Sequence, residues 1–308
     1  MRSIDFAGVL ALGALWGASF IFMRVASPQF NPIPVADLRV IIGGLLLLAV
    51  ALPAGLRLDI RGRWRQYLVL GTLNVAIPYA LISAAATELP ASLSSILIAT
   101  TPVFAAIVGW LWLRDPLTGR QVIGVVLGLA GVGLLVGWTP LDVTTGVALS
   151  IGAVVLAALC YGFCSHYSAR ALRSGAGMEI PIMQQLTAAA LLLPFAAATV
   201  PDSSPAGKAI LSVVALGLFT TGIAVLLFFR LIRRVGPFRT NIATYFTPAF
   251  GILWGALLLD ERLSVGTFVG FGIILASALM MSDVGLARLR SIRTPSSREA
   301  RASRTIAE

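Results

Sequence analysis

Ten continuously apolar stretches, separated by short polar joints, run along the chain. Each stretch has about the 20 residues that a helix needs to cross the hydrocarbon layer of a membrane. The apolar residues do not alternate with polar ones, and lipid offers the backbone no hydrogen-bonding partner, so we expect helices rather than strands. The predicted helices cover approximately residues 6–26, 33–53, 67–87, 91–113, 119–137, 146–168, 180–200, 209–229, 237–259 and 265–283.

The joints and the two ends of the chain complete this pattern. Turn residues fill the short joints, as at 27–32 and 201–205. Arg2 is followed closely by Asp5, and no small-residue cleavage site closes the first stretch, so we expect the first helix to be retained. Residues 285–308 are rich in Arg and Ser, which predicts a basic disordered cytoplasmic tail.

Composition supports a membrane protein. Of 308 residues, 58% are hydrophobic and 12% are charged, whereas a soluble domain has about 25% charged residues. So few charges cannot cover a soluble surface, and the fold class predicted is an all-α polytopic membrane protein. Cys160 and Cys164 lie in one apolar stretch, which fits neither a disulfide framework nor a zinc site.

The net charge of +10 reflects where the basic residues lie. In a ten-helix chain most of them fall on one side, and only Lys208 and Arg262 fall on the other. Since cytoplasmic loops carry the excess of Lys and Arg, we expect a multi-pass protein of a bacterial-type inner membrane with both termini cytoplasmic. The charge therefore indicates topology, and we expect contact with membrane lipids and not with nucleic acid. The side with the excess receives Arg2, Arg57, Arg61, Arg63, Arg65, Arg114, Arg120, Arg170, Arg173, Arg230, Arg233, Arg234, Arg239 and the arginines from Arg288 to Arg304.

The chain repeats itself at a shift of 146 residues. Thr-Pro-Val-Phe at 101–104 returns as Thr-Pro-Ala-Phe at 247–250, and the helices of the two halves correspond one for one. Each half has five predicted helices, so the halves must enter the membrane in opposite directions. Inverted repeats of this kind are typical of secondary transporters. We predict one five-helix repeat at 1–138 and a second at 139–284, followed by the tail.

Several motifs resemble a known family. They are Leu-Trp-Gly-Ala-Ser-Phe at 15–20, Asp-Leu-Arg at 37–39, and each Thr-Pro followed by an acidic turn and a glycine-bearing helix. They resemble the EamA-type transporters of the drug/metabolite transporter superfamily. The resemblance implies ten helices in two inverted repeats around a central cavity that opens to alternate sides. It also implies export of small metabolites, often amino acids or their derivatives.

One position departs from the family pattern. Members usually have a glutamate in the turn after helices four and nine. Glu261 matches that pattern, but Asp115, followed by Pro116, stands in the first turn. If this carboxylate closes a gate or anchors a turn, we expect the two halves to do so unequally.

The paired prolines suggest a binding site. A proline inside a helix removes a backbone donor, so Pro102 frees a carbonyl near position 98 and Pro248 frees one near 244. Those carbonyls, with nearby threonine hydroxyls, would bind polar groups of a solute. Alternatively, the prolines only kink helices for packing, and neighbouring Ser and Thr satisfy the freed groups.

Aromatic and amide side chains extend this candidate site. Buried Trp and Tyr usually need a partner for their polar atom, and these aromatic residues could line a cavity or simply pack in the core. Asn74, Gln184 and Gln185 could line the cavity or form interhelical hydrogen bonds. The predicted solute-binding residues are Trp16, Asn74, Tyr79, Thr100, Thr101, Pro102, Tyr161, Thr244, Tyr245, Thr247, Pro248 and Trp254.

Charged residues within the spans are costly and often functional. Near the outer ends of helices one to three they could form a structural ion-pair cluster, or an arginine could hold a solute carboxylate while an acid takes part in gating. His166, the only histidine, could transfer protons or be a hydrogen-bonded core residue. The predicted gating or coupling residues are Arg24, Asp37, Arg39, Glu88, His166, Asp115 and Glu261.

Enzymatic patterns are missing from the sequence. Gly-Leu-Ala-Gly-Val-Gly at 128–133 has the wrong order for a dinucleotide loop and lies mid-helix. There is no Walker loop and no hydrolase motif, so we expect no enzyme, no cofactor and no metal site. The glycines of helices five and ten favour close packing and a possible homodimer.

Together these patterns predict a secondary transporter that exports a small-molecule solute, an amino acid or related compound, by alternating access. Two other classes stay open. A passive channel or facilitator would show no saturable counterflow, and a lipid-handling protein would have a cavity that opens laterally between helices.

Overall fold

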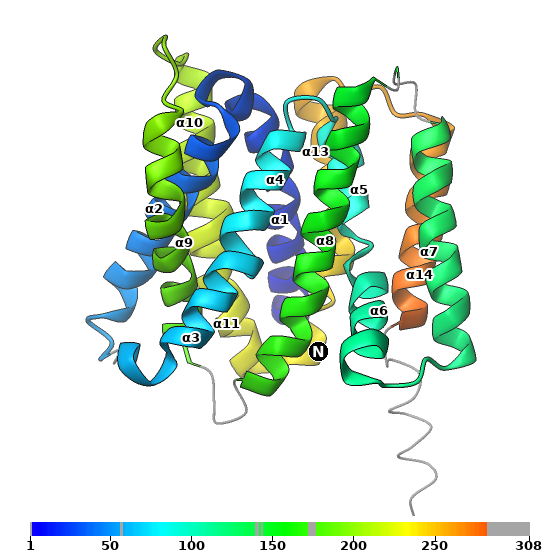
Figure 1. Cartoon of the computed structure of the whole chain (residues 1–308), viewed down its shortest axis with the longest axis horizontal. Coiled ribbons are helices and arrows are strands. Elements are labelled where there is room, and N and C mark those ends of the chain that lie inside the picture. The colour runs from blue at the N-terminus through cyan, green and yellow to red at the C-terminus, as the bar shows by residue number, and fades with distance from the viewer. Residues whose placement is uncertain (1, 56–57, 139–141, 143, 172–176, 282–308) are drawn as a thin grey trace, which may run out of the picture.

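The computed structural model describes residues 2–55, 58–138, 142, 144–171 and 177–281, and Figure 1 shows the arrangement. Over these residues the chain is helical and contains no strand. The predicted tail at 285–308, and Arg57 and Arg173, lie outside the described residues. The elements are α1 (Ser3–Phe30), α2 (Pro32–Ala51), α3 (Ile60–Leu70), η1 (Gly71–Ala76), α4 (Ile77–Ala85), α5 (Ala91–Ile98), α6 (Thr101–Leu113), α7 (Gly119–Trp138), α8 (Thr145–Ala171), α9 (Glu179–Ala198), α10 (Gly207–Ala215), η2 (Leu216–Ile223), α11 (Ala224–Val235), α12 (Pro237–Thr240), α13 (Ala243–Leu259) and α14 (Val265–Met281).

Length and composition allow most of these helices to cross a membrane. Within the described residues, nine helical runs are long and apolar enough to do so, and α14 is a shorter apolar helix. Several runs join successive elements, such as Ile60–Ala85 through α3, η1 and α4. The prediction of an all-α polytopic membrane protein is confirmed.

The predicted joint at 27–32 is wrong for its first four residues. Helix α1 continues through Pro28 to Phe30, and Asn31, with a φ of 66°, ends it. The reason is tertiary. Gln29 accepts a hydrogen bond from the Ala206 amide (2.8 Å), and the Asn31 side-chain amide donates to the Thr199 carbonyl (2.9 Å), so the turn between α9 and α10 holds the last turn of α1.

The two ends of the bundle carry different turns. We call the end with the turns 86–90, 199–206 and 260–264 the upper end, which is at the top of Figure 1. The lower end holds the N-terminus, the turn 114–118 that follows α6, and the C-terminal end of α11. Most of the described arginines lie at the lower end, whereas Arg24, Lys208 and Arg262 lie at the upper end.

Several contacts between helices of the two halves occur in matched pairs: each of these contacts has a counterpart in which every helix is replaced by the corresponding helix of the other half. Helix α1 packs along α13 as α8 packs along α6, and α2 packs on η2 as α9 packs on η1. Glycines allow the first of these pairs. A Cβ on Gly17 would lie 2.8 Å from the Thr247 carbonyl oxygen, and one on Gly162 would lie 2.7 Å from the Ala105 amide nitrogen. Close helix approach therefore occurs beside both Thr-Pro segments.

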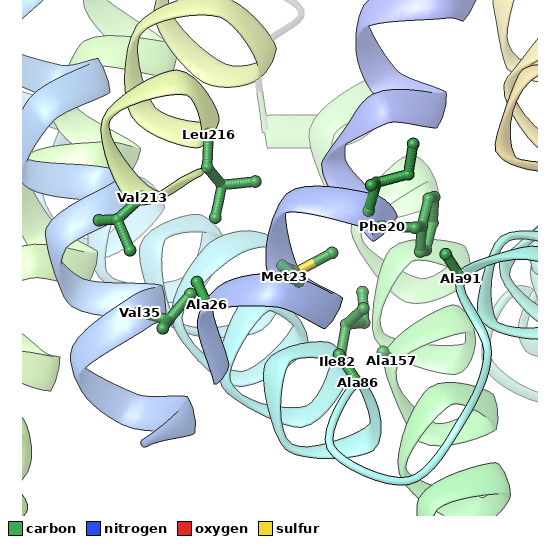
Figure 2. Close-up of a cluster of buried hydrophobic side chains, with 11 residues drawn as sticks. Phe20, Met23, Ala26, Val35, Ile82, Ala86, Ala91, Ala157, Val213 and Leu216 are labelled. Atoms are coloured by element: carbon green, nitrogen blue, oxygen red, sulfur yellow. The ribbon is translucent and has the colours of Figure 1, made fainter. Parts of the chain in front are cut away.

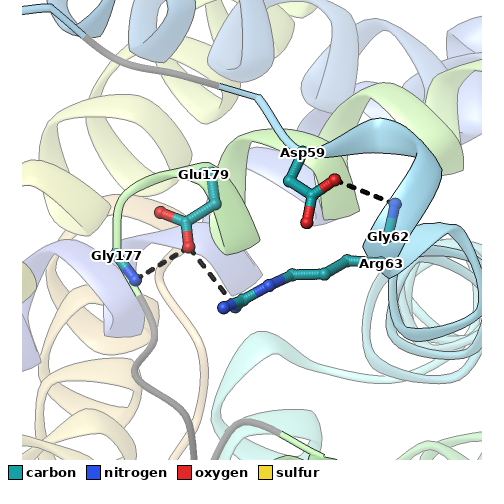
Figure 3. Close-up of polar contacts among 5 residues, drawn as sticks. All are labelled: Asp59, Gly62, Arg63, Gly177 and Glu179. Atoms are coloured by element: carbon teal, nitrogen blue, oxygen red, sulfur yellow. Dashed lines mark hydrogen bonds and ion pairs between the residues drawn. The ribbon is translucent and has the colours of Figure 1, made fainter.

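An apolar core fills the upper half between α1, α2, α4, α8 and η2. Figure 2 shows this cluster, in which Phe20 and Met23 of α1 lie close to Ile82 of α4. One group of polar contacts lies at the lower end (Figure 3), where Arg63 of α3 forms an ion pair of 3.5 Å with Glu179 of α9. The Asp59 side chain caps α3 by accepting from the Gly62 amide (2.9 Å).

Candidate functional site

The carboxylate of Glu261 fastens the end of α13 to the start of α5. One oxygen accepts from the Ala91 amide (2.6 Å), and the other accepts from the Ser92 amide (3.1 Å) and the Ser92 hydroxyl (2.6 Å). The first turn of a helix has unpaired N–H groups and a partial positive charge. Glu261 therefore satisfies two of these donors and adds a favourable negative charge.

Arg24 of α1 holds the other side of the same turn. Its Nη1 donates to the carbonyls of Ala86 (2.8 Å) and Thr87 (2.6 Å), just after the end of α4. Unpaired carbonyls at a helix C-terminus favour a cation. We call the contacts of Arg24 and Glu261 with residues 86–92 the upper latch.

A cavity of about 430 Å³ lies between the two charged side chains of the upper latch. It is at the upper end, not at the depth of the prolines. Its lining residues are Arg24, Val25, Pro28, Thr87, Pro90, Leu259 and Glu261.

The turn after α6 repeats the backbone of the turn after α13. Arg114 (φ 57°) and Asp260 (φ 52°) are both left-handed C-caps. The amide of Asp115 donates to the Gly109 carbonyl (3.3 Å), as that of Glu261 donates to the Gly255 carbonyl (3.2 Å). The Asp115 side chain, however, is exposed and bonds to none of the described residues.

Helix packing shows the same difference between the ends. At the upper end α5 packs against α13, α8 and α1. At the lower end its counterpart α12 packs chiefly against α11. Among the described residues, no hydrogen bond or ion pair joins α12 or α13 to α6 or α8 there. Among the described residues, a turn carboxylate therefore caps a facing helix at the upper end and not at the lower end, where ion pairs instead join α3 to α9 and α11 to α1.

The predicted proline sites are not equivalent in the structure. The helical run through α5 and α6 is interrupted at residues 99–100, and Pro102 lies in the first turn of α6, whereas Pro248 lies inside α13. The Ile98 carbonyl that Pro102 frees accepts the Thr101 hydroxyl (2.7 Å). The contacts of Pro102 therefore agree with the packing alternative.

The other three predicted threonines also donate to backbone carbonyls three or four residues earlier in the chain. Thr100 bonds to the Leu97 carbonyl (2.6 Å), Thr244 to the Asn241 carbonyl (2.7 Å) and Thr247 to the Ala243 carbonyl (3.1 Å). Thr100 is buried, whereas Thr244 is exposed. These hydroxyls can bind a solute only as acceptors while those bonds persist.

The five predicted aromatic residues are all partly exposed, but they do not form one group. Tyr161 and Trp254 pack against the core cluster of Figure 2, and the Trp254 indole donates to the Ala14 carbonyl (3.1 Å). The Trp16 ring lies against that of Phe228, with centroids 5.7 Å apart and the ring planes tilted by 45°. The phenol oxygens of Tyr79, Tyr161 and Tyr245 bond to none of the described residues.

The ion-pair alternative for the outer ends of helices one to three has no support among the described residues. Arg24, Asp37, Arg39 and Glu88 form no ion pair with one another, because Arg24 turns to backbone carbonyls, Arg39 turns to Tyr79 and Glu88 is exposed. Asp37 is 2% exposed, and its Oδ1 has no hydrogen-bond partner among the described residues.

The remaining predicted polar residues make ordinary interhelical bonds. The His166 Nε2 lies 2.8 Å from the Ala105 carbonyl, which agrees with a hydrogen-bonded core residue. The Asn74 side chain donates to that of Gln184 (3.1 Å). No cluster of three or more metal-ligating side chains occurs in the part of the chain that the structure describes.

A sequence profile of the EamA-like transporter family matches residues 5–137 and again residues 148–283. The chain belongs to the EamA-like transporter family. The resemblance inferred from the motifs is confirmed, and the protein is a multi-pass membrane transporter.

Relatives of this EamA-like chain are themselves transporters. It is 28% identical over 273 residues to the uncharacterized transporter YvbV of Bacillus subtilis (strain 168), covering 87% of this chain and 88% of the relative. It is 25% identical over 282 residues to the uncharacterized inner membrane transporter YedA of Escherichia coli (strain K12), covering 90% of each.

Two further comparisons concern substrate and fold. A Streptantibioticus cattleyicolor protein named "probable terminal-alkyne amino-acid exporter" is 23% identical over 286 residues, covering 92% of this chain and 95% of that protein. A crystal structure aligns with a TM-score of 0.65 at 18% identity, covering 96% of this chain and all of the other. The second likeness shows the EamA-like chain's fold alone.

Some functional contacts were missed by the sequence reasoning. Ala91 and Ser92 were not singled out, nor was Thr221, which contacts Arg39. A Ser at the second position of a helix that follows a proline is a weak capping signal. Nothing in the sequence indicates that the capping carboxylate comes from a turn 169 residues away.

Proposed function

We propose that this transporter exports a small metabolite, an amino acid or a related compound, by alternating access, and that the structure is its inward-facing state. The observation that carries the proposal is the upper latch, which has no counterpart among the described residues of the lower end. Arg24 and Glu261 tie α1 and α13 to the α4–α5 turn at the upper end, while the equivalent turn at the lower end is not fastened. An occluding contact at one end only is what an alternating-access carrier needs.

The orientation within the membrane follows from the arginines. If the lower end faces the cytoplasm, the excess of basic residues obeys the positive-inside rule. Opening of the lower end would then admit a cytoplasmic solute, which suits export. Both described termini, near Arg2 and Met281, lie at that end.

We also propose that the two halves are inverted repeats. Support comes from the matched helix contacts, from the matched turns at Arg114 and Asp260, and from the two separate segments that the family profile matches. Two similar halves can exchange roles, so that the lower end closes as the upper end opens.

The solute class rests on one named relative, the amino-acid exporter described above. Proteoliposomes loaded with a mixture of L-amino acids test it directly. Release of an amino acid above that from protein-free liposomes, measured by mass spectrometry and saturable with concentration, is the expected result. Release equal to that from protein-free liposomes would contradict the proposal, and non-saturable release would indicate a channel.

Cysteine labelling tests the state and the orientation. In a chain without Cys160 and Cys164, we expect cysteine at exposed Thr118 to react only from the cytoplasm and cysteine at exposed Ser203 only from outside. Cysteine at Thr244, in the lower part of α13, should react from the cytoplasm. Labelling of Thr118→Cys from outside would reverse the orientation.

A further inference from the structure

Arg39 is a charged residue buried within a membrane-spanning helix. It lies in α2 and is 5% exposed. An arginine inside a membrane-spanning segment is costly and is retained where it has a function or a strong partner. The contacts of its guanidinium show whether Arg39 has such a strong partner within the bundle.

The partners of Arg39 use only part of its donors. Nε donates to the Thr221 hydroxyl of η2 (2.8 Å), and the guanidinium carbon lies 3.7 Å from the centre of the Tyr79 ring. Nη1 faces the sulfur of Met23 at 3.8 Å, which is a weak acceptor. Nη2 donates to none of the described residues. The edge formed by Nη1 and Nη2 therefore keeps donors that no strong acceptor of the described residues uses.

No carboxylate of the described residues pairs with Arg39. Asp37 precedes it by two positions on the same helix, and residues two apart do not face each other. Arg24, by contrast, is engaged with two carbonyls, and Arg234 is paired with Asp5 at 2.9 Å. Arg39 thus places a positive charge in the bundle without an acidic partner.

The other half of the chain shows that packing does not require this charge. Gly217 of η2 lies against the carbonyl of Arg39 and the side chain of Ile42. In the other half, Gly71 of η1 lies in the same way against the carbonyl of Gln184 and the side chain of Thr187. Gln184 therefore occupies the position that corresponds to Arg39.

The side chains at these two positions make corresponding contacts. Gln184 accepts a hydrogen bond from Asn74 of η1, as Arg39 donates to Thr221 of η2. The neutral amide of Gln184 thus joins α9 to η1 at the place where Arg39 joins α2 to η2. A positive charge is not needed for this contact between the two helical segments. The charge of Arg39 is then the feature that packing leaves unexplained.

We propose that the Nη1–Nη2 edge of Arg39 binds the carboxylate of the transported solute. A guanidinium pairs with a carboxylate through two parallel N–H···O bonds. The Tyr79 ring lies 3.7 Å from the guanidinium carbon, so it would contact the apolar part of the solute. The inference rests on the proposed transport function and narrows its substrates to small monocarboxylates with an apolar or aromatic body.

The experiment compares carboxylates with amides of the same skeleton. The probes are L-phenylalanine with L-phenylalaninamide, and benzoate with benzamide, at matched ionic strength. Binding to the purified full chain is measured by thermal stabilisation, and release from proteoliposomes is measured separately by mass spectrometry. The variants are Arg39→Gln, which places the residue of the other half at this position, Arg39→Lys, and the charge-matched control Arg230→Gln at an exposed site.

We expect the carboxylates, and not the amides, to stabilise the wild-type chain. Arg39→Gln should weaken this binding about ten- to one-hundred-fold, since hydrogen bonds to charged groups contribute about 1.5–3 kcal/mol. Arg39→Lys should retain part of it, and Arg230→Gln should resemble wild type. Size-exclusion chromatography of each variant distinguishes loss of binding from misfolding, and if Arg39→Gln fails to fold, Arg39→Lys with its partial loss provides the test.

The outcomes separate this inference from the transport function. Release of amides as fast as carboxylates, or equal binding of carboxylates by Arg39→Gln, would overturn the role of Arg39 while transport stands. Carboxylate binding that depends on Arg39 without release would support the site and contradict transport. If neither probe pair stabilises the wild-type chain, the proposed site is wrong.

Discussion

The turns after α6 and after α13 have the same backbone and opposite surroundings. Both begin with a left-handed residue, Arg114 or Asp260, and both return an amide to a glycine carbonyl. The carboxylate that follows is engaged in one turn and exposed in the other. Glu261 accepts three hydrogen bonds from the start of α5, while Asp115 bonds to none of the described residues.

Side-chain chemistry explains part of this difference. Asp115 is one methylene shorter than Glu261. At a shift of 146 residues, Pro237 and Phe238 replace Ala91 and Ser92, so the start of α12 lacks one amide donor and the hydroxyl. A latch at the lower end would therefore have fewer hydrogen bonds than the upper latch. The comparison teaches that a duplicated fold can favour one conformation through a few capping residues.

Glu261→Ala should have the largest effect on this comparison. It removes three bonds to a charged acceptor, and with a net loss of about 2 kcal/mol we expect the upper end to open roughly thirty-fold more often. The measurement is the labelling rate, from outside, of a cysteine at buried Ser94 in the cysteine-free chain. Asp202→Ala, an exposed carboxylate at the same end, is the control. An unchanged rate would show that Glu261 does not hold the upper end closed.

Arg24→Met should have the next largest effect. It keeps an apolar side chain of similar length but removes two bonds to the Ala86 and Thr87 carbonyls. Water can replace part of this loss, so we expect about a ten-fold faster labelling of the same reporter. Arg262→Met, an exposed arginine nearby, should label as wild type does. Equal rates for both variants would remove Arg24 from the latch.

A triple variant sharpens the comparison from the other end. Asp115→Glu with Pro237→Ala and Phe238→Ser gives the lower end the latch residues of the upper end. With about 1 kcal/mol of added hydrogen bonding, we expect cytoplasmic labelling of a cysteine at Thr244 to fall about five-fold. The single Asp115→Glu variant is the control and should show a smaller decrease. A triple variant that labels as fast as wild type would mean that these residues do not meet in the outward-facing state.

Ser92→Ala should have the smallest effect. It removes only the hydroxyl bond to Glu261, and the two amide bonds remain. A single hydrogen bond contributes about 1 kcal/mol, so labelling at Ser94 should rise only about three- to five-fold. An effect as large as that of Glu261→Ala would mean that the hydroxyl, and not the helix N-terminus, dominates the latch.

The candidate site was only partly predictable from the sequence. Glu261 and Asp115 stand out because they are different acids in corresponding turns of the two halves. Arg24 and Arg39 stand out because they are charged residues in apolar stretches. Their roles depended on distant partners. Arg24 bonds to carbonyls more than sixty positions away and Arg39 to Thr221, and no local pattern specifies such a contact.

The sequence by itself determined the helices, because a helix that crosses lipid needs about 20 apolar residues in a row, and such a run can be recognised without its neighbours. The family and the two similar halves were also recognisable from short motifs in the sequence. The tertiary structure alone decided which end carries the latch, which arginine keeps unused donors, and that the Thr101 hydroxyl satisfies the carbonyl freed by Pro102. These depend on how helices from the two halves meet. The 2.6 Å bond from the Ala91 amide to Glu261, for example, forms only if α5 and α13 lie in the right relative position. The order of residues along the chain does not specify that position.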